Sequence, residues 1–294
     1  MPGEIAALIT ACCWTVTAMS FEAAGRRIGS MVVNLLRLLL ALVFLSIFGY
    51  LTRGRAFPTD AGAHAWIWLS LSGLIGFVVG DLALFRAFVL IGARISMLLM
   101  SLVPMFTAIF GFIIMGERLS ISDVAGMSLT MSGVMLVVSQ RQSRGNEKPQ
   151  RLPVKGILLG LCGALGQAGG LVLSKYGMGA YNAFAATQIR VIAGASAFII
   201  IFSAIGWWPK VMAAFKDRGG IARMSLGTFF GPFLGVSFSL LAVQNTQAGV
   251  AATIMSITPI LMIAPAAMIF KERITLRAVI GAVVAVAGVA LVSL

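Results

Sequence analysis

Long runs of apolar residues dominate this chain, and short polar segments separate the runs from one another. Each run holds about 18 or more mostly apolar residues, which is the length that a helix needs to cross a bilayer. The runs lack the apolar/polar alternation of barrel strands, so a membrane β-barrel is excluded. The pattern predicts ten membrane-spanning helices, at residues 4–23, 31–51, 65–85, 93–115, 121–139, 154–174, 181–204, 222–243, 248–270 and 275–293.

The longest polar segment, QRQSRGNEKPQRLP at residues 140–153, falls at the middle of the chain. It separates a first half, residues 1–140, from a second half, residues 154–294, with a linker at 141–153. The halves repeat each other, because residues 93–138 align with 248–293 without a gap at an offset of 155. Identical pairs at this offset are Ala93/Ala248, Met100/Met255, Ser101/Ser256, Pro104/Pro259, Glu117/Glu272, Arg118/Arg273, Gly126/Gly281 and Gly133/Gly288.

Five spans in each half is an odd number, so the second half must enter the membrane in the opposite direction. Such inverted repeats are typical of secondary transporters, in which two related bundles open a midplane site to either side in turn. We therefore expect the Glu-Arg pair at residues 117–118 and its mate at 272–273 to lie on opposite faces of the membrane.

Composition agrees with a membrane protein, since 60% of the residues are hydrophobic and 11% are charged. The net charge of +13 comes from Lys and Arg in short loops, where they act as topology signals, so nucleic-acid binding is not predicted. The distribution of these charges favours termini outside the cell. The three cysteines lie in apolar runs, which gives neither a disulfide framework nor a metal site.

The ten spans, the Arg in spans 2 and 7 (NLLRLLLA, TQIRVIAG) and the S-x-x-P…(G/K)-E-R segment in spans 4 and 9 resemble the EamA-type drug/metabolite transporter superfamily. The resemblance covers essentially the whole chain. It implies an all-α integral membrane protein with two inverted five-helix repeats around a central cavity, lined by spans 1, 3, 4, 6, 8 and 9. Members mostly export small metabolites, and the chain is most similar to the branch that exports amino acids, aromatic ones included. Relatives place both termini inside, which conflicts with the charge distribution.

Pro104 and Pro259 are the predicted hinges. Proline removes a backbone donor and bends a helix, which leaves a carbonyl free to line a wet cavity. A static bend that improves packing is the alternative, and the in-phase repetition favours a role in gating.

A charged residue inside a span is expected to have a partner or a function, because a charge at the bilayer centre costs on the order of 2.5–3.5 kcal/mol. Asp81 in span 3 either accepts a proton or a substrate ammonium, or it forms an ion pair with Arg37 or Arg86. Glu22 and Lys175 lie near helix ends, as interfacial charges or as a gate pair across the pseudo-axis.

Uncharged polar and aromatic side chains are the other cavity candidates, since a transporter binds loosely through a few polar contacts on an apolar wall. We predict a substrate cavity that contains Asp81 together with Trp14, Thr17, Phe77, Phe85, Met97, Met100, Ser101, Gln167, Gln244, Asn245 and Ser256.

No catalytic constellation, metal motif or phosphate-binding loop is visible, so we predict neither an enzyme nor a cofactor. The sequence favours a multi-pass exporter of small amphipathic metabolites in the inner (cytoplasmic) membrane, functional as a monomer, with a small-molecule substrate and the bilayer as partners. A multidrug efflux pump and, in another class, a membrane-embedded lipid-handling enzyme are the alternatives. Proton antiport and facilitated diffusion both stay open.

Overall fold

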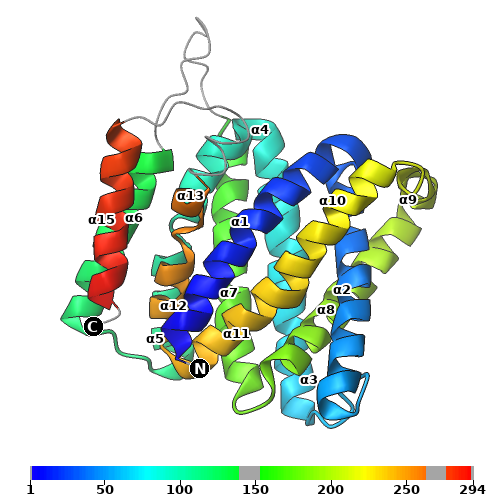
Figure 1. Cartoon of the computed structure of the whole chain (residues 1–294), viewed down its shortest axis with the longest axis horizontal. Coiled ribbons are helices and arrows are strands. Elements are labelled where there is room, and N and C mark those ends of the chain that lie inside the picture. Colours follow the sequence, from blue (N-terminus) through cyan, green and yellow to red (C-terminus); the bar gives the residue numbers. More distant parts are fainter. Residues whose placement is uncertain (1, 139–152, 263–275, 293–294) are drawn as a thin grey trace, which may run out of the picture. The chain divides into compact units, whose positions relative to one another are not determined.

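Helices make up the whole of the ordered secondary structure in residues 2–138, 153–262 and 276–292, which are the residues that the computed structural model describes (Figure 1). At residues 85, 88–89, 92–95, 97–98, 138 and 278 only the backbone is described. The first half consists of α1 (Gly3–Ile28), α2 (Ser30–Arg53), α3 (Ala63–Gly73), the π-helix η1 (Leu74–Gly80), α4 (Asp81–Met100), α5 (Val103–Met115) and α6 (Ile121–Val138).

The second half repeats this series of elements with two changes: a short helix, α9, is added, and the segment equivalent to α4 is divided into α11 and α12. Its described elements are α7 (Val154–Met178), α8 (Ala183–Ala204), α9 (Trp208–Ala214), α10 (Arg218–Thr228), the π-helix η2 (Phe229–Gly235), α11 (Val236–Asn245), α12 (Ala248–Met255), α13 (Thr258–Leu261) and α15 (Leu276–Val292).

The apolar helices correspond to the predicted spans. Six helical stretches within the described residues are long and apolar enough to cross a membrane. The other four predicted spans overlap the shorter apolar helices Val103–Met115, Ile121–Val137, Ala248–Leu261 and Val279–Val292. The predicted fold class, an all-helical membrane protein, is therefore confirmed.

Large apolar side chains cover the outside of these helices. Leu51, Ile113 and Ile200, for example, are exposed, whereas Phe198 and Phe202 are fully buried. In water such an apolar exterior would be a large interaction or aggregation surface. In a bilayer it is the surface that faces the lipid tails.

Two segments between predicted spans are helical in the structure. Residues 86–92, predicted as a loop between spans 3 and 4, are helical and belong to α4. This segment contains no proline and a single glycine, so nothing in it breaks a helix. The polar segment after span 7 was predicted as a loop, and it contains α9, which starts with a proline in its first turn.

Two compact units can be distinguished by their internal contacts. Unit 1 consists of Met1–Val78 and Gly170–Thr246, and unit 2 of Val79–Gly169 and Gln247–Leu294. Each unit therefore takes helices from both halves of the sequence. The chain passes from one unit to the other inside η1, inside α7 and at the turn between α11 and α12.

In unit 2, α6 and α15 lie side by side and run in opposite directions (Figure 1). A β-carbon added at Gly126 would come 2.7 Å from the carbonyl oxygen of Gly288, and one added at Gly288 would come 2.7 Å from the carbonyl oxygen of Gly126. Gly133 and Gly281 approach each other in the same reciprocal way. Small residues of this kind let membrane helices pack closely through their backbones.

The centre of this crossing is formed by residues that are equivalent in the repeat. Thr130 Oγ1 lies 3.4 Å from the carbonyl oxygen of Ala285, and these two residues are 155 positions apart. Equivalent helices of the two halves are thus antiparallel, and their contacts are exchanged by a two-fold rotation. This geometry is what an inverted-topology repeat requires. The predicted test of inversion, the Glu-Arg pair at 272–273, lies outside the described residues.

The two π-helices are a second repeated feature. η1 has the sequence LIGFVVG and η2 has FFGPFLG, again at an offset of 155. Gly76 and Gly80 in η1 correspond to Gly231 and Gly235 in η2. Pro232 accounts for a widened helical turn in η2, because proline removes an internal hydrogen bond. Residues of π-helices are often found at functional sites, which directs attention to the side chains around these two turns.

Candidate functional site

In unit 2, a buried carboxylate directly follows η1. Asp81 is the first residue of α4 and is 7% exposed. Gln167 on α7 donates a hydrogen bond of 2.8 Å from Nε2 to Asp81 Oδ1. The structure thus brings together two of the predicted cavity residues, which are 86 positions apart in the chain.

A glycine on α7 makes this contact possible. A β-carbon at Gly163 would lie 3.2 Å from Cβ of Leu84 and 3.4 Å from the carbonyl oxygen of Gly80, so α7 passes close to the junction of η1 and α4. Gln167 stands one turn further along the same face of α7. Because burial of a polar group is costly without a partner, the amide and the carboxylate stabilise each other here.

Two-residue interruptions divide the helices at the predicted prolines. α4 ends at Met100, and Pro104 lies in the first turn of α5. In the second half α12 ends at Met255, and Pro259 lies in the first turn of α13. We predicted a bend inside one helix, and the structure shows two helices in succession, because proline fits the first helical turn without loss of a hydrogen bond.

Serine occupies the first residue of both interruptions. Ser101 is buried. Its repeat mate Ser256 is half-buried, and its hydroxyl donates to the carbonyl oxygen of Thr253 at 2.7 Å. Met100, also half-buried, precedes the first interruption. Discontinuous helices of this kind form substrate sites in many transporters, because the unwound backbone offers carbonyls and N–H groups.

In unit 1, Trp14 and Thr17 of α1 lie against η2. A β-carbon at Gly235 would come within 3.0 Å of the Trp14 indole, and one at Gly231 within 2.6 Å of the Thr17 methyl group. Thr17 is buried and donates to the carbonyl oxygen of Cys13 at 2.8 Å. Both predicted residues therefore touch the second π-turn, as Asp81 adjoins the first.

Phe77, the other aromatic residue of the predicted cavity in unit 1, contacts an arginine that lies within a predicted span. The guanidinium of Arg190 lies 4.8 Å from the centre of the Phe77 ring, and both residues are buried. The repeat-related Arg37 lies 5.5 Å from the ring centre of Phe21. Cation–π contacts of this type stabilise a charge away from water.

Four predicted site residues have partners at the ends of helices. Gln244 donates hydrogen bonds to the carbonyl oxygens of Gly179 and Tyr181. Asn245 donates to the carbonyl oxygen of Leu241, and Lys175 donates to that of Thr246. Glu22 forms an ion pair with Arg26.

Glu22 and Lys175 do not form an ion pair in this structure. Lys175 lies beside Thr246, and Gly3 at the start of α1 also approaches Thr246. Glu22 is 19 residues further along α1, or roughly 28 Å at the rise of an α-helix. The side chains of Phe85 and Met97 lie outside the described residues.

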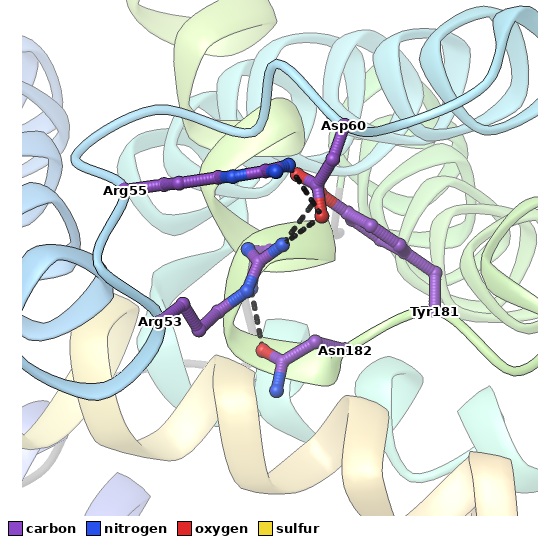
Figure 2. A network of polar contacts seen from close by, with 6 residues as sticks. Arg53, Arg55, Asp60, Tyr181 and Asn182 are labelled. Atoms are coloured by element: carbon purple, nitrogen blue, oxygen red, sulfur yellow. Dashed lines mark hydrogen bonds and ion pairs between the residues drawn. The ribbon is translucent and has the colours of Figure 1, made fainter.

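A polar network at one end of unit 1 was not predicted (Figure 2). Arg53 pairs with Asp60, and Arg55 lies 3.6 Å from the same carboxylate. The hydroxyl of Tyr181 donates to Asp60 Oδ1 at 2.9 Å and lies 3.3 Å from Arg53. The network ties the loop after α2 to the loop before α8. Tyr181 lies more than 100 residues from the others, so only the folded structure reveals it.

Asp60→Asn should lower the stability of the protein in a pH-dependent way. Tyr181 and Arg53 hold the pKa of Asp60 below its usual value of 3.8, so the stabilisation is present above that value and is lost as the pH falls through the folded pKa. The network is accessible to solvent, so we expect a loss of no more than about 1 kcal/mol at pH 7. Thermal unfolding in detergent at pH 7 and pH 3 measures it. Equal differences between mutant and wild type at both pH values would contradict this role.

Glu117, part of the repeated Glu-Arg pair, has a structural role in unit 2. Its carboxylate accepts a hydrogen bond of 2.9 Å from the backbone N–H of Ala248, the first residue of α12. A carboxylate at this position satisfies a helix N-terminus and complements its partial positive charge.

Within the described residues no group of three or more His, Cys, Asp or Glu side chains could hold a metal ion.

Comparison with known proteins relates both halves of the chain to one family. The EamA-like transporter family matches residues 1–139 and 154–294. A search of curated proteins finds no match. Among 29 matching chains of solved structures, one described as "Crystal structure of protein" has a TM-score of 0.78. It is 16% identical, and the match covers 98% of this chain and 94% of the other, which supports the fold.

Proposed function

The chain belongs to the EamA-like transporter family, and we propose that it is a secondary transporter that exports small amphipathic metabolites, with amino acids, aromatic ones included, as substrates. We place it in the inner (cytoplasmic) membrane as a functional monomer. The observation that carries the proposal is the repeated discontinuity of its helices. Both halves contain a π-turn and a two-residue interruption at equivalent positions, and the halves are inverted.

The polar groups near the discontinuities of unit 2 suit a ligand with one charged end and an apolar body. The carboxylate of Asp81 can hold an ammonium, and Gln167 positions it. A few polar groups on an apolar wall bind a ligand loosely enough to release it, which export requires.

The chain also contains backbone that suits the motion of alternating access. It passes between the compact units within η1, between Gly169 and Gly170, and at a short turn after Thr246. π-turns and paired glycines are among the usual causes of helix bending. We propose that changes at these three places accompany the opening of the site to alternate sides.

Purified protein in proteoliposomes should give saturable amino-acid flux. Aromatic amino acids should compete with one another, because each would place its ammonium on the carboxylate of Asp81. Uptake of radiolabelled amino acids into liposomes with and without protein is the measurement. Absence of flux for every amino acid, with thermal stabilisation by cationic dyes, would favour the multidrug alternative, for which Asp81 would be the cation-binding group.

A further inference from the structure

A pocket of about 460 Å³ lies at the end of unit 1 where α1 turns into α2. Its walls come from the α1–α2 turn, from α9 and from the segment that leads into α10. The polar groups on these walls include Arg27, Ser30, Lys210 and Asp217, and Trp207 provides an aromatic face. None of these residues belongs to the transport site proposed above.

The pocket carries positive charge, although it also contains a carboxylate. Arg27 Nε donates to both oxygens of Asp217, at 2.9 and 3.1 Å, and Asp217 also accepts from the N–H of Gly220 at the start of α10. These donors lower the pKa of Asp217, so it stays ionised and its charge is matched by Arg27. The two bonds use a single nitrogen of the guanidinium, Nε, so its two outer nitrogens take no part in them.

Lys210, on the wall formed by α9, is held by a contact with an aromatic ring. Its ammonium lies 3.7 Å from the centre of the Trp207 ring, and Trp207 packs edge-on against the fully buried Phe202. A cation–π contact fixes the position of the charge but does not neutralise it. α2 starts at this pocket without a side-chain cap, and the partial charge of its N-terminus adds to the positive potential.

The surroundings place the pocket at the boundary of the bilayer. Two long apolar spans, α1 and α2, meet at Gly29, and α8 ends close before α9. α9 buries Val211 and Ala214, whereas Met212 and the neighbouring Phe215 are 66% and 55% exposed. Exposed apolar side chains next to Trp and Lys are typical of a segment that lies among lipid headgroups.

We infer that this pocket binds the headgroup of an anionic phospholipid, with the phosphodiester between Arg27 and Lys210 and the acyl chains along the apolar surface beside α9. Charge complementarity supports this occupant, because anionic headgroups are attracted to basic groups at the membrane surface. The lipid would be a structural ligand of unit 1, independent of which metabolite is exported.

Lys210→Gln tests the inference, with Lys216→Gln as the matched control. Lys216 is an exposed lysine of the same segment that does not line the pocket. Native mass spectrometry after delipidation and titration should show wild-type protein retaining phosphatidylglycerol in preference to phosphatidylcholine. Lys210→Gln should bind phosphatidylglycerol on the order of fivefold more weakly, the effect of one basic residue near a membrane surface. Lys216→Gln should bind it as the wild type does.

Two further arms separate a lipid from a soluble anion, which offers the same phosphate chemistry. Inorganic phosphate and glycerol 3-phosphate are added to delipidated protein at millimolar concentration, and thermal unfolding is followed. We expect no stabilisation by either, and a higher Tm with phosphatidylglycerol. Equal retention of both lipids, equal effects of the two lysine variants, or stabilisation by the soluble phosphates as large as that by lipid would each overturn the inference.

Discussion

Asp81→Asn is expected to reduce transport in proteoliposomes by about tenfold or more, since a hydrogen bond to a charged group contributes about 1.5–3 kcal/mol. Asparagine keeps the size of the side chain and can still accept the hydrogen bond from Gln167. It removes the charge that would bind a proton or a substrate ammonium. An imposed pH gradient distinguishes the two roles. Loss of the response to the gradient indicates proton coupling, whereas a raised KM without a changed pH response indicates substrate binding.

Asp123→Asn is the matched control for this experiment. Asp123 accepts a hydrogen bond from the backbone N–H of Ser120 at the start of α6, away from η1 and the helix interruptions. Its replacement should leave both the flux and the pH response as in the wild type. Flux and pH response that are the same in Asp81→Asn and in wild type would contradict a role of Asp81 in transport.

Gly133→Leu should destabilise the protein by about 3 kcal/mol or more, the upper range for overpacking. A β-carbon at this position would lie 2.5 Å from the backbone nitrogen of Ala285 and 2.5 Å from the carbonyl oxygen of Gly281. Backbone atoms cannot turn aside as a side chain does, so α6 and α15 would have to separate. The measurements are thermal unfolding in detergent and the fraction of monodisperse protein after purification.

Ser132→Leu serves as the control for size and hydrophobicity. Ser132 is the adjacent residue of α6 and is exposed, so a leucine there would face lipid tails. The repeat also predicts that Gly288→Leu, at the position equivalent to Gly133 on the other helix of the crossing, is as harmful as Gly133→Leu. Similar stability of Gly133→Leu and Ser132→Leu would refute the close crossing.

Much of the fold could be predicted from the sequence, because the bilayer restricts membrane-spanning segments to simple patterns. Apolar length located the spans, and an odd number of spans per half implied inversion. The α6–α15 crossing shows that inversion directly. We did not predict that residues 86–92 are helical or that α9 forms. The first depends on the absence of a helix breaker and the second on a proline in the first helical turn. Neither feature appears in the apolar periodicity.

The candidate site could be predicted less completely. Asp81, Gln167, Trp14 and Thr17 were recognised as polar or aromatic residues within spans, but their grouping around two π-turns was not. The repeated glycines of LIGFVVG and FFGPFLG were a usable signal at the same offset of 155. The Arg53–Asp60–Tyr181 network and the pocket beside α9 depend on contacts between distant loops, which no local pattern shows.

The reciprocal contacts of Gly126 with Gly288 and of Gly133 with Gly281 have the form of an isologous interface, as in a two-fold symmetric dimer. Two copies of a single five-helix chain could make the same contact, with one threonine or alanine from each copy at the axis. In the present chain both partners are covalently joined, so the interface forms at a high effective concentration. Its two sides are therefore free to differ in sequence, and a carboxylate such as Asp81 can stand in one half where the other half has Val236.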